Sequence, residues 1–175
     1  MMHSILLVLC VITVSDTSWE TAGKLALEKV NWGWRPESWT IEFKPGKPGY
    51  LGMKYRDEKK IVIWVRPKQS PEEVASVIAH ELAHVFSQLY INAELRQEWL
   101  KARGIPLTTL WNPPDTKKGE KEKSDYLYGE GDFAESVAWT LQGGHFSGKL
   151  GPAPNRTQQE LILKWLRTLP KERSE

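Results

Sequence analysis

The feature that most constrains this sequence is a twenty-residue helical pattern over residues 71–90. Ser70 is a suitable N-cap, Pro71 stands at the first helical position, and Glu73 completes a capping-box pattern. The apolar residues that follow recur at helical spacing and form one stripe: Val74, Val77, Ile78, Leu82, Val85 and Leu89. We therefore expect a long helix here, with the other elements of the domain packed on its apolar stripe.

Length and charge limit the classes of protein to which the chain can belong. Its 175 residues fit one domain, and a domain of this size can bury a core without disulfides. Cys10 is the single cysteine, which excludes an intrachain disulfide and a cysteine-built zinc finger. The net charge of +2 lacks the basic excess of a dedicated nucleic-acid binder, so we expect no nucleic-acid partner. We also expect the protein to be a monomer.

The N-terminal segment contains a run of ten residues, 5–14, that is apolar except for one threonine. It is too short to span a bilayer, which takes about 20 residues, but it matches the apolar part of a secretory signal peptide. No lysine or arginine precedes it. We expect residues 1–15 to be a signal peptide or anchor and 16–175 to form the domain, which favours a secreted or membrane-anchored protein over a cytoplasmic one. A buried strand or helix is the alternative.

Around the long helix, the hydrophobic periodicity predicts an α+β fold. Helical spacing is found over 18–30, 93–102, 132–141 and 157–169, and strand patterns over 39–43, 50–56 and 61–66. We expect a small antiparallel or mixed sheet packed on the helix at 71–90. The strand at 61–66 fits either a peptide-binding sheet edge or a buried central position. Residues 104–131 are predicted to form a long irregular segment.

The long helix carries the motif His80-Glu81-Leu82-Ala83-His84. Residues four apart lie on one helix face about 6 Å apart, so His80 and His84 can bind one metal ion together. Glu81 can then reach a metal-activated water as general base and acid. The expected cofactor is one Zn²⁺, which lowers the pKa of such a water.

A catalytic zinc needs a third protein ligand and keeps its fourth position for water. Residues 85–90 do not continue the motif with a third histidine, so the ligand must lie elsewhere. The candidates downstream are Asp132, Glu135 and His145.

With these residues the chain resembles zincin metallopeptidases of the gluzincin type, and also small uncharacterised HExxH proteins of bacteria. The resemblance rests on residues 70–90 and 125–140, where Glu135-Ser136-Val137-Ala138 matches a ligand glutamate standing three residues before an alanine. It implies a zincin-like fold with Glu135 as third ligand. The usual supporting acid four residues later falls on Trp139, so Asp132 is expected either to support Glu135 or to replace it as ligand.

Two tyrosines, Tyr126 and Tyr128, stand just before this segment and are candidate donors to the oxyanion of a tetrahedral intermediate. The predicted function is therefore zinc-dependent hydrolysis of a peptide or protein substrate. A non-catalytic zinc-stabilised module that binds peptide or cell wall, and a metal amidase acting on another amide, are the alternatives. The nine tryptophans fit either a compact core or the lining of a cleft.

Overall fold

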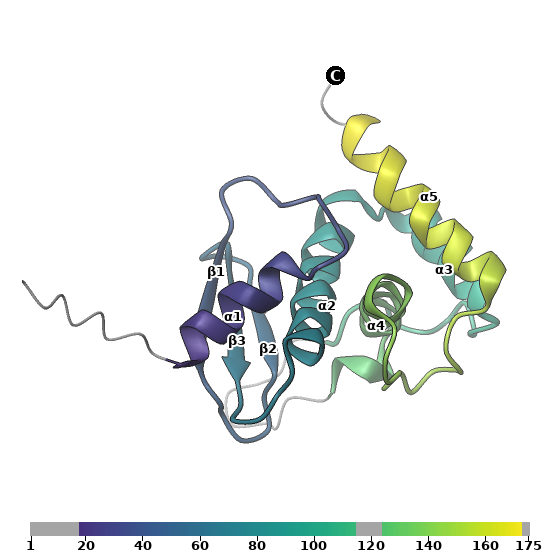
Figure 1. The fold of residues 1–175 in the computed structure, drawn as a ribbon. Coiled ribbons are helices and arrows are strands. Elements are labelled where there is room, and N and C mark those ends of the chain that lie inside the picture. The colour runs from purple at the N-terminus through teal and green to yellow at the C-terminus, as the bar shows by residue number, and fades with distance from the viewer. Residues whose placement is uncertain (1–17, 115–123, 173–175) are drawn as a thin grey trace, which may run out of the picture.

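The computed structural model describes residues 18–114 and 124–172 (Figure 1). The candidate signal peptide at 1–15 lies outside these residues. The elements, in chain order, are α1 (Ser18–Glu28), β1 (Thr40–Pro45), β2 (Gly52–Tyr55), β3 (Lys60–Val65), α2 (Pro71–Tyr90), α3 (Ala93–Arg103), the 3₁₀ turn η1 (Asp125–Leu127), α4 (Gly129–Gln142) and α5 (Arg156–Glu172). Within the described ranges, no helix combines the length and apolar character needed to cross a membrane.

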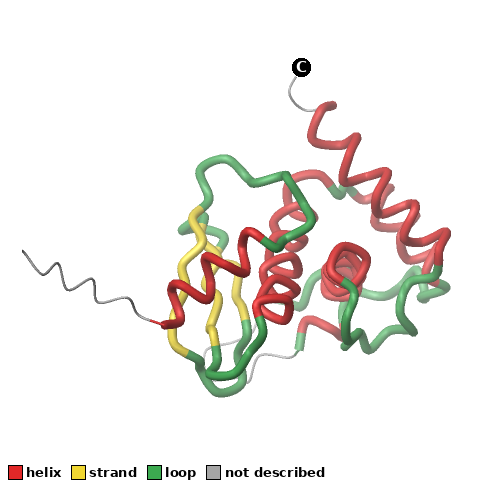
Figure 2. The backbone as a smooth tube through the Cα atoms, in the orientation of Figure 1, coloured by secondary structure: helices red, strands yellow, loops and turns green. Residues whose placement is uncertain are grey.

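The three strands form one mixed sheet in the order β1-β3-β2 (Figure 2). β3 pairs in parallel with β1 and antiparallel with β2. The predicted α+β class and mixed sheet are confirmed. β3 covers most of residues 61–66, for which the pattern allowed either a sheet edge or a central strand, and it occupies the central position. β2 forms one edge of the sheet.

One face of the sheet meets α1 and α2. Ile61, Ile63 and Val65 alternate along β3 toward these helices, and all three belong to the main hydrophobic core. Figure 1 shows α1 crossing this face, α2 beside it, and α4 on the other side of α2. α2 is therefore enclosed between the sheet and α4, which buries all residues from Ile78 to Ser87.

The start of α2 is built as the sequence predicts. Ser70 Oγ accepts a hydrogen bond from the backbone N–H of Glu73 at 3.2 Å, and the Ser70 N–H donates to Glu73 Oε2 at 2.7 Å. This reciprocal capping box leaves two fewer unpaired donors at the helix start. It fixes the beginning of the helix, and with it the direction in which the later histidines point.

Tryptophans from turns and from helices contribute to the core. Trp32 stacks on Trp34 with ring centroids 4.9 Å apart, and both contact Phe86 of α2. Trp99 is fully buried, and Trp111 and Trp165 flank Phe133 of α4. Of the two roles that the sequence allowed, these side chains take the one in core packing.

Candidate metal centre

The two histidines of α2 point toward each other on the buried side of the helix. Their rings lie 4.8 Å apart between centroids, and the two Nε2 atoms are 3.1 Å apart. Their side chains are only 9% and 8% exposed. The helix therefore aims two nitrogen ligands at one point, as the four-residue spacing predicts.

A third ligand atom completes this group, and it comes from Asp125 in η1. Asp125 Oδ2 lies 3.1 Å from Nε2 of His80 and 3.1 Å from Nε2 of His84. Zinc that binds nitrogen and oxygen at about 2.0–2.1 Å in tetrahedral geometry separates its ligands by about 3.3 Å. The three donor atoms therefore lie close enough together to be shared by one metal ion. The Asp125 side chain is 37% exposed, so solvent reaches this side of the site.

The remaining ring nitrogens face carboxylates of α4. His80 Nδ1 is hydrogen-bonded to Glu135 Oε2 at 3.1 Å, and His84 Nδ1 lies 3.3 Å from Glu130 Oε2. Glu135 is held in turn by the backbone N–H of Ser147. Carboxylates in this position fix the tautomer and orientation of metal-binding histidines. Each imidazole thus directs its Nε2 toward Asp125 and the other histidine, and its Nδ1 toward a carboxylate of α4.

The carboxylates and imidazoles shift one another's pKa values. Burial alone would lower the pKa of His80, but Asp125 and Glu135 outweigh it and raise the pKa to about 10. The pKa of His84 is likewise raised by Asp125 and Glu130 in spite of burial. The two histidines hold the pKa of Asp125 well below its usual range. The pKa values of Glu130 and Glu135 are lowered by the same histidines, so all three acids stay ionised beside them.

The close approach of η1 to α4 depends on Gly131. A Cβ at this position would lie 2.2 Å from the carbonyl oxygen of Asp125 and 2.4 Å from its carbonyl carbon. Real Cβ atoms essentially never come this close to another atom. Glycine at 131 thus lets the backbone of Asp125 rest on α4, at the distance from which its carboxylate reaches both histidines.

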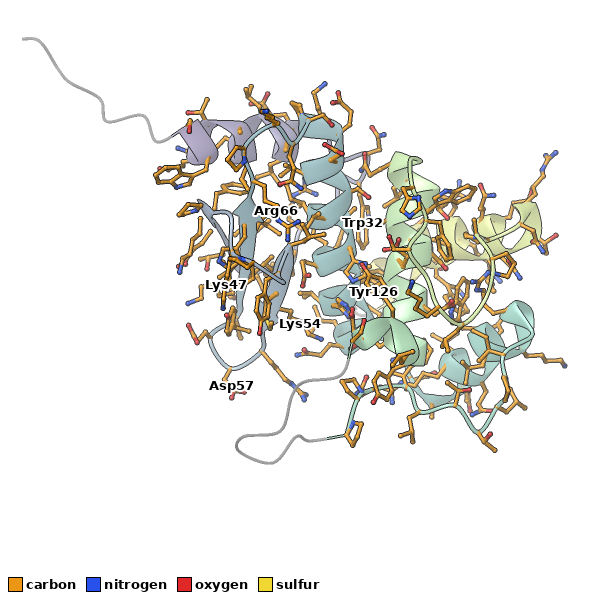
Figure 3. All side chains as sticks on the ribbon, turned by 90° about the horizontal axis from the view of Figure 1, so that it is seen from below. Trp32, Lys47, Lys54, Asp57, Arg66 and Tyr126 are labelled. Atoms are coloured by element: carbon orange, nitrogen blue, oxygen red, sulfur yellow. The ribbon has the colours of Figure 1, made fainter. Side chains whose placement is uncertain are left out.

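Glu81 lies between the two histidines and the edge strand. It is buried, and burial raises the pKa of its carboxyl group. A Cβ on Gly52 of β2 would lie 2.6 Å from Glu81 Oε1, so the missing side chain leaves room for this carboxylate. Two residues along, Lys54 Nζ donates to the carbonyl of His84 at 3.3 Å. Figure 3 shows Lys54 on the sheet side of α2 and Tyr126 near the start of α4.

Of the two predicted oxyanion donors, Tyr126 is the one with contacts to the centre. Its ring packs against His80 with centroids 5.4 Å apart. Burial and the charges of Glu135, Asp125 and Glu81 raise the pKa of its phenol, which keeps the hydroxyl protonated and able to donate. Tyr128 is buried between η1 and α4.

Asp132 lies away from the histidines and has a structural role. Its carboxylate accepts hydrogen bonds from Arg103 at both oxygens, each 2.9 Å long, and from Trp99 Nε1 at 3.0 Å. Both ends of the Arg103 pair are almost fully buried. Asp132 therefore joins α4 to α3 and supports neither histidine, in contrast to the support or ligand role expected for it. His145 is exposed on a loop.

The group of donor atoms thus differs from the sequence-based expectation. Among the described residues, the one group of three metal-ligating side chains is His80, His84 and Asp125. Glu135 lies behind the His80 ring, on the nitrogen opposite the converging atoms. Sequence reasoning missed Asp125 and Glu130. Both lie in the acid-rich stretch 125–135, but Asp125 belongs to a turn and has no helical spacing to distinguish it.

Comparisons of the chain with protein-family models, with curated proteins and with solved structures find no match.

Proposed function

We propose that this chain is a zinc-dependent hydrolase that cleaves peptide bonds. The observation that carries the proposal is the convergence of three ligand atoms, from His80, His84 and Asp125, next to the glutamate of the same helix motif. Three protein ligands with an open side are typical of catalytic zinc, whereas structural zinc sites close with four. The resemblance to zincins, carried by residues 70–90 and 125–140, supports the same class. We infer Asp125 as third ligand in place of Glu135.

Bound zinc supplies the Lewis acidity that makes a water nucleophilic near neutral pH. The chain's own residues then handle the protons. Glu81 takes the proton of the attacking water and delivers it to the leaving amine, a role for which its raised pKa is suited. Tyr126 keeps its proton and donates a hydrogen bond to the substrate carbonyl oxygen as negative charge develops there.

The edge strand favours an extended peptide as substrate over other amides. Within the described part of the chain, β2 pairs only with β3, so its second edge has no strand partner and is the edge to which we assign strand addition. Gly52 brings this strand against Glu81. A peptide that extends the sheet along β2 therefore presents its backbone carbonyls beside the general base.

The test is cleavage of a diverse peptide pool by the full chain loaded with zinc, followed by mass spectrometry. Glu81→Gln is expected to keep its zinc and to lose activity by about 10²–10⁴-fold, the usual contribution of a general base. Glu72→Gln, on an exposed turn of the same helix, is the matched control and should cleave like the unmodified protein. Equal cleavage by the Glu81 and Glu72 variants would refute the enzymatic role.

A further inference from the structure

A pocket beside the metal centre is formed by side chains from several elements. Its lining is polar throughout and comprises Lys54, Arg56, Gln88, Arg96, Asn112 and Glu130. β2 and the turn after it supply the first two residues, α2 and α3 supply the next two, the loop after α3 supplies Asn112, and α4 supplies the last. We call these six residues the basic pocket, because three of them are cationic and one is acidic.

The charges of the basic pocket do not cancel. Glu130 is engaged by Lys54, whose Nζ lies 3.4 Å from Glu130 Oε1. Arg96 is fixed by a hydrogen bond from Nε to the carbonyl of Ile91 and by the ring of Trp111, 5.7 Å from its guanidinium. Among the described residues, the Arg56 guanidinium has no hydrogen-bond or ion-pair partner, although the Arg56 carbonyl accepts a hydrogen bond from the Lys59 N–H. Two guanidinium groups thus remain for an anion, and the planar guanidinium suits a carboxylate.

The basic pocket also adjoins the site of the proposed reaction. Glu130 belongs to both, since its other oxygen lies 3.3 Å from His84 Nδ1. Along β2, Gly52 touches Glu81, and Lys54 lines the pocket two residues further on. Two residues of extended strand span about 7 Å. A peptide lying along β2 would therefore place a group in the pocket one or two residues from the bond at the centre.

We propose that the basic pocket binds a carboxylate of the peptide substrate, on an acidic side chain or at the C-terminus, within two residues of the scissile bond. This rests on the proposed peptidase function and names the substrate feature that the enzyme selects. Arg56 and Arg96 supply the charge. Lys54 positions the wall of the pocket through Glu130 and the His84 carbonyl.

The test measures binding, so that it does not depend on cleavage. The zinc-loaded full chain with Glu81→Gln is titrated calorimetrically with C-terminally amidated hexapeptides that carry one Glu or one Gln at the same place. A third peptide carries Gln and a free C-terminal carboxylate. The Glu peptide or the free-carboxylate peptide is expected to bind at least about tenfold more tightly than the amidated Gln peptide, because a charge-assisted hydrogen bond contributes this much.

Paired variants locate the effect. Arg56→Gln with Arg96→Gln should reduce the preference to less than about twofold, and Arg56→Gln alone should reduce it without disturbing a packed side chain. The control is Arg156→Gln with Arg167→Gln on the exposed face of α5, which should keep the full preference. Equal binding of all three peptides, or a preference that survives in the pocket variant, would overturn the proposal. If the protein prefers the carboxylate peptides but the unmodified chain cleaves no peptide, the peptidase function is refuted and the carboxylate-binding site is still supported.

Discussion

Replacing Gly131 by alanine is predicted to remove the proposed zinc site without unfolding the protein. The new Cβ would lie 2.2 Å from the Asp125 carbonyl oxygen, where ordinary contacts begin near 3.4 Å. The backbone of η1 must therefore move by about 1.2 Å, the difference between these distances. Metal–ligand distances tolerate only about 0.2 Å, so the Asp125 carboxylate loses its position. Alanine inside a helix itself gains about 0.5–1 kcal/mol over glycine, which offsets part of the strain.

The assay is zinc affinity, measured by competition with a fluorescent chelator, together with thermal unfolding followed by circular dichroism. We expect the affinity of Gly131→Ala to fall at least about 100-fold, beyond the 10–100-fold typical for loss of a supporting residue. Gly129→Ala is the control on the same helix, because its Cβ would meet the Trp111 ring and not Asp125. It should lose stability and keep zinc. A folded Gly131→Ala protein with unchanged zinc affinity would refute the role given to η1.

Three further outcomes are expected. Asp132→Ala removes the carboxylate partner of the buried Arg103 and should lower the free energy of unfolding by about 3–5 kcal/mol in urea titrations, while zinc is still bound. Glu135→Gln and Glu130→Gln should each weaken zinc binding by about 10–100-fold without abolishing it. Complete loss of zinc in either variant would show that the replaced glutamate is itself a zinc ligand. In the metal-free protein, the raised pKa of His80 contributes stability that is fully present below pH 6.5 and is lost as pH rises through about 10. The lowered pKa of Glu130 contributes stability that is present above pH 4.5 and is lost as pH falls toward about 2. The melting temperature of chelator-treated protein should therefore be highest between pH 4.5 and 6.5, and a maximum at pH 9 would contradict the pairing.

The fold was predictable where local signals are strong. Ser70, Pro71 and Glu73 define the start of α2 through backbone hydrogen bonds within three residues, and the structure has the helix from Pro71 to Tyr90 as predicted. Strand pairing depends on contacts between distant segments. Residues 39–43 and 61–66 were recognisable as strands, but nothing in their alternation indicated that β1 and β3 run parallel.

The site was likewise predictable only where it depends on the geometry of a single helix. The positions of His80 and His84 on one face follow from helix geometry alone. The sequence also predicts the helix around Glu135, yet whether an acid meets Nε2 or Nδ1 of an imidazole depends on how α4 and η1 pack. Asp132 illustrates the limit, because its partner Arg103 lies 29 residues earlier in another helix and no spacing links the two.

Zinc stoichiometry of two variants tests the account most directly. The full chain, Asp125→Ala and Glu135→Ala are each dialysed against limiting zinc with a competing chelator, and bound metal is measured by atomic absorption. We predict one zinc in the unmodified protein, none in Asp125→Ala, and a weakened but measurable site in Glu135→Ala. Full zinc in Asp125→Ala together with none in Glu135→Ala would contradict the ligand set proposed from the structure.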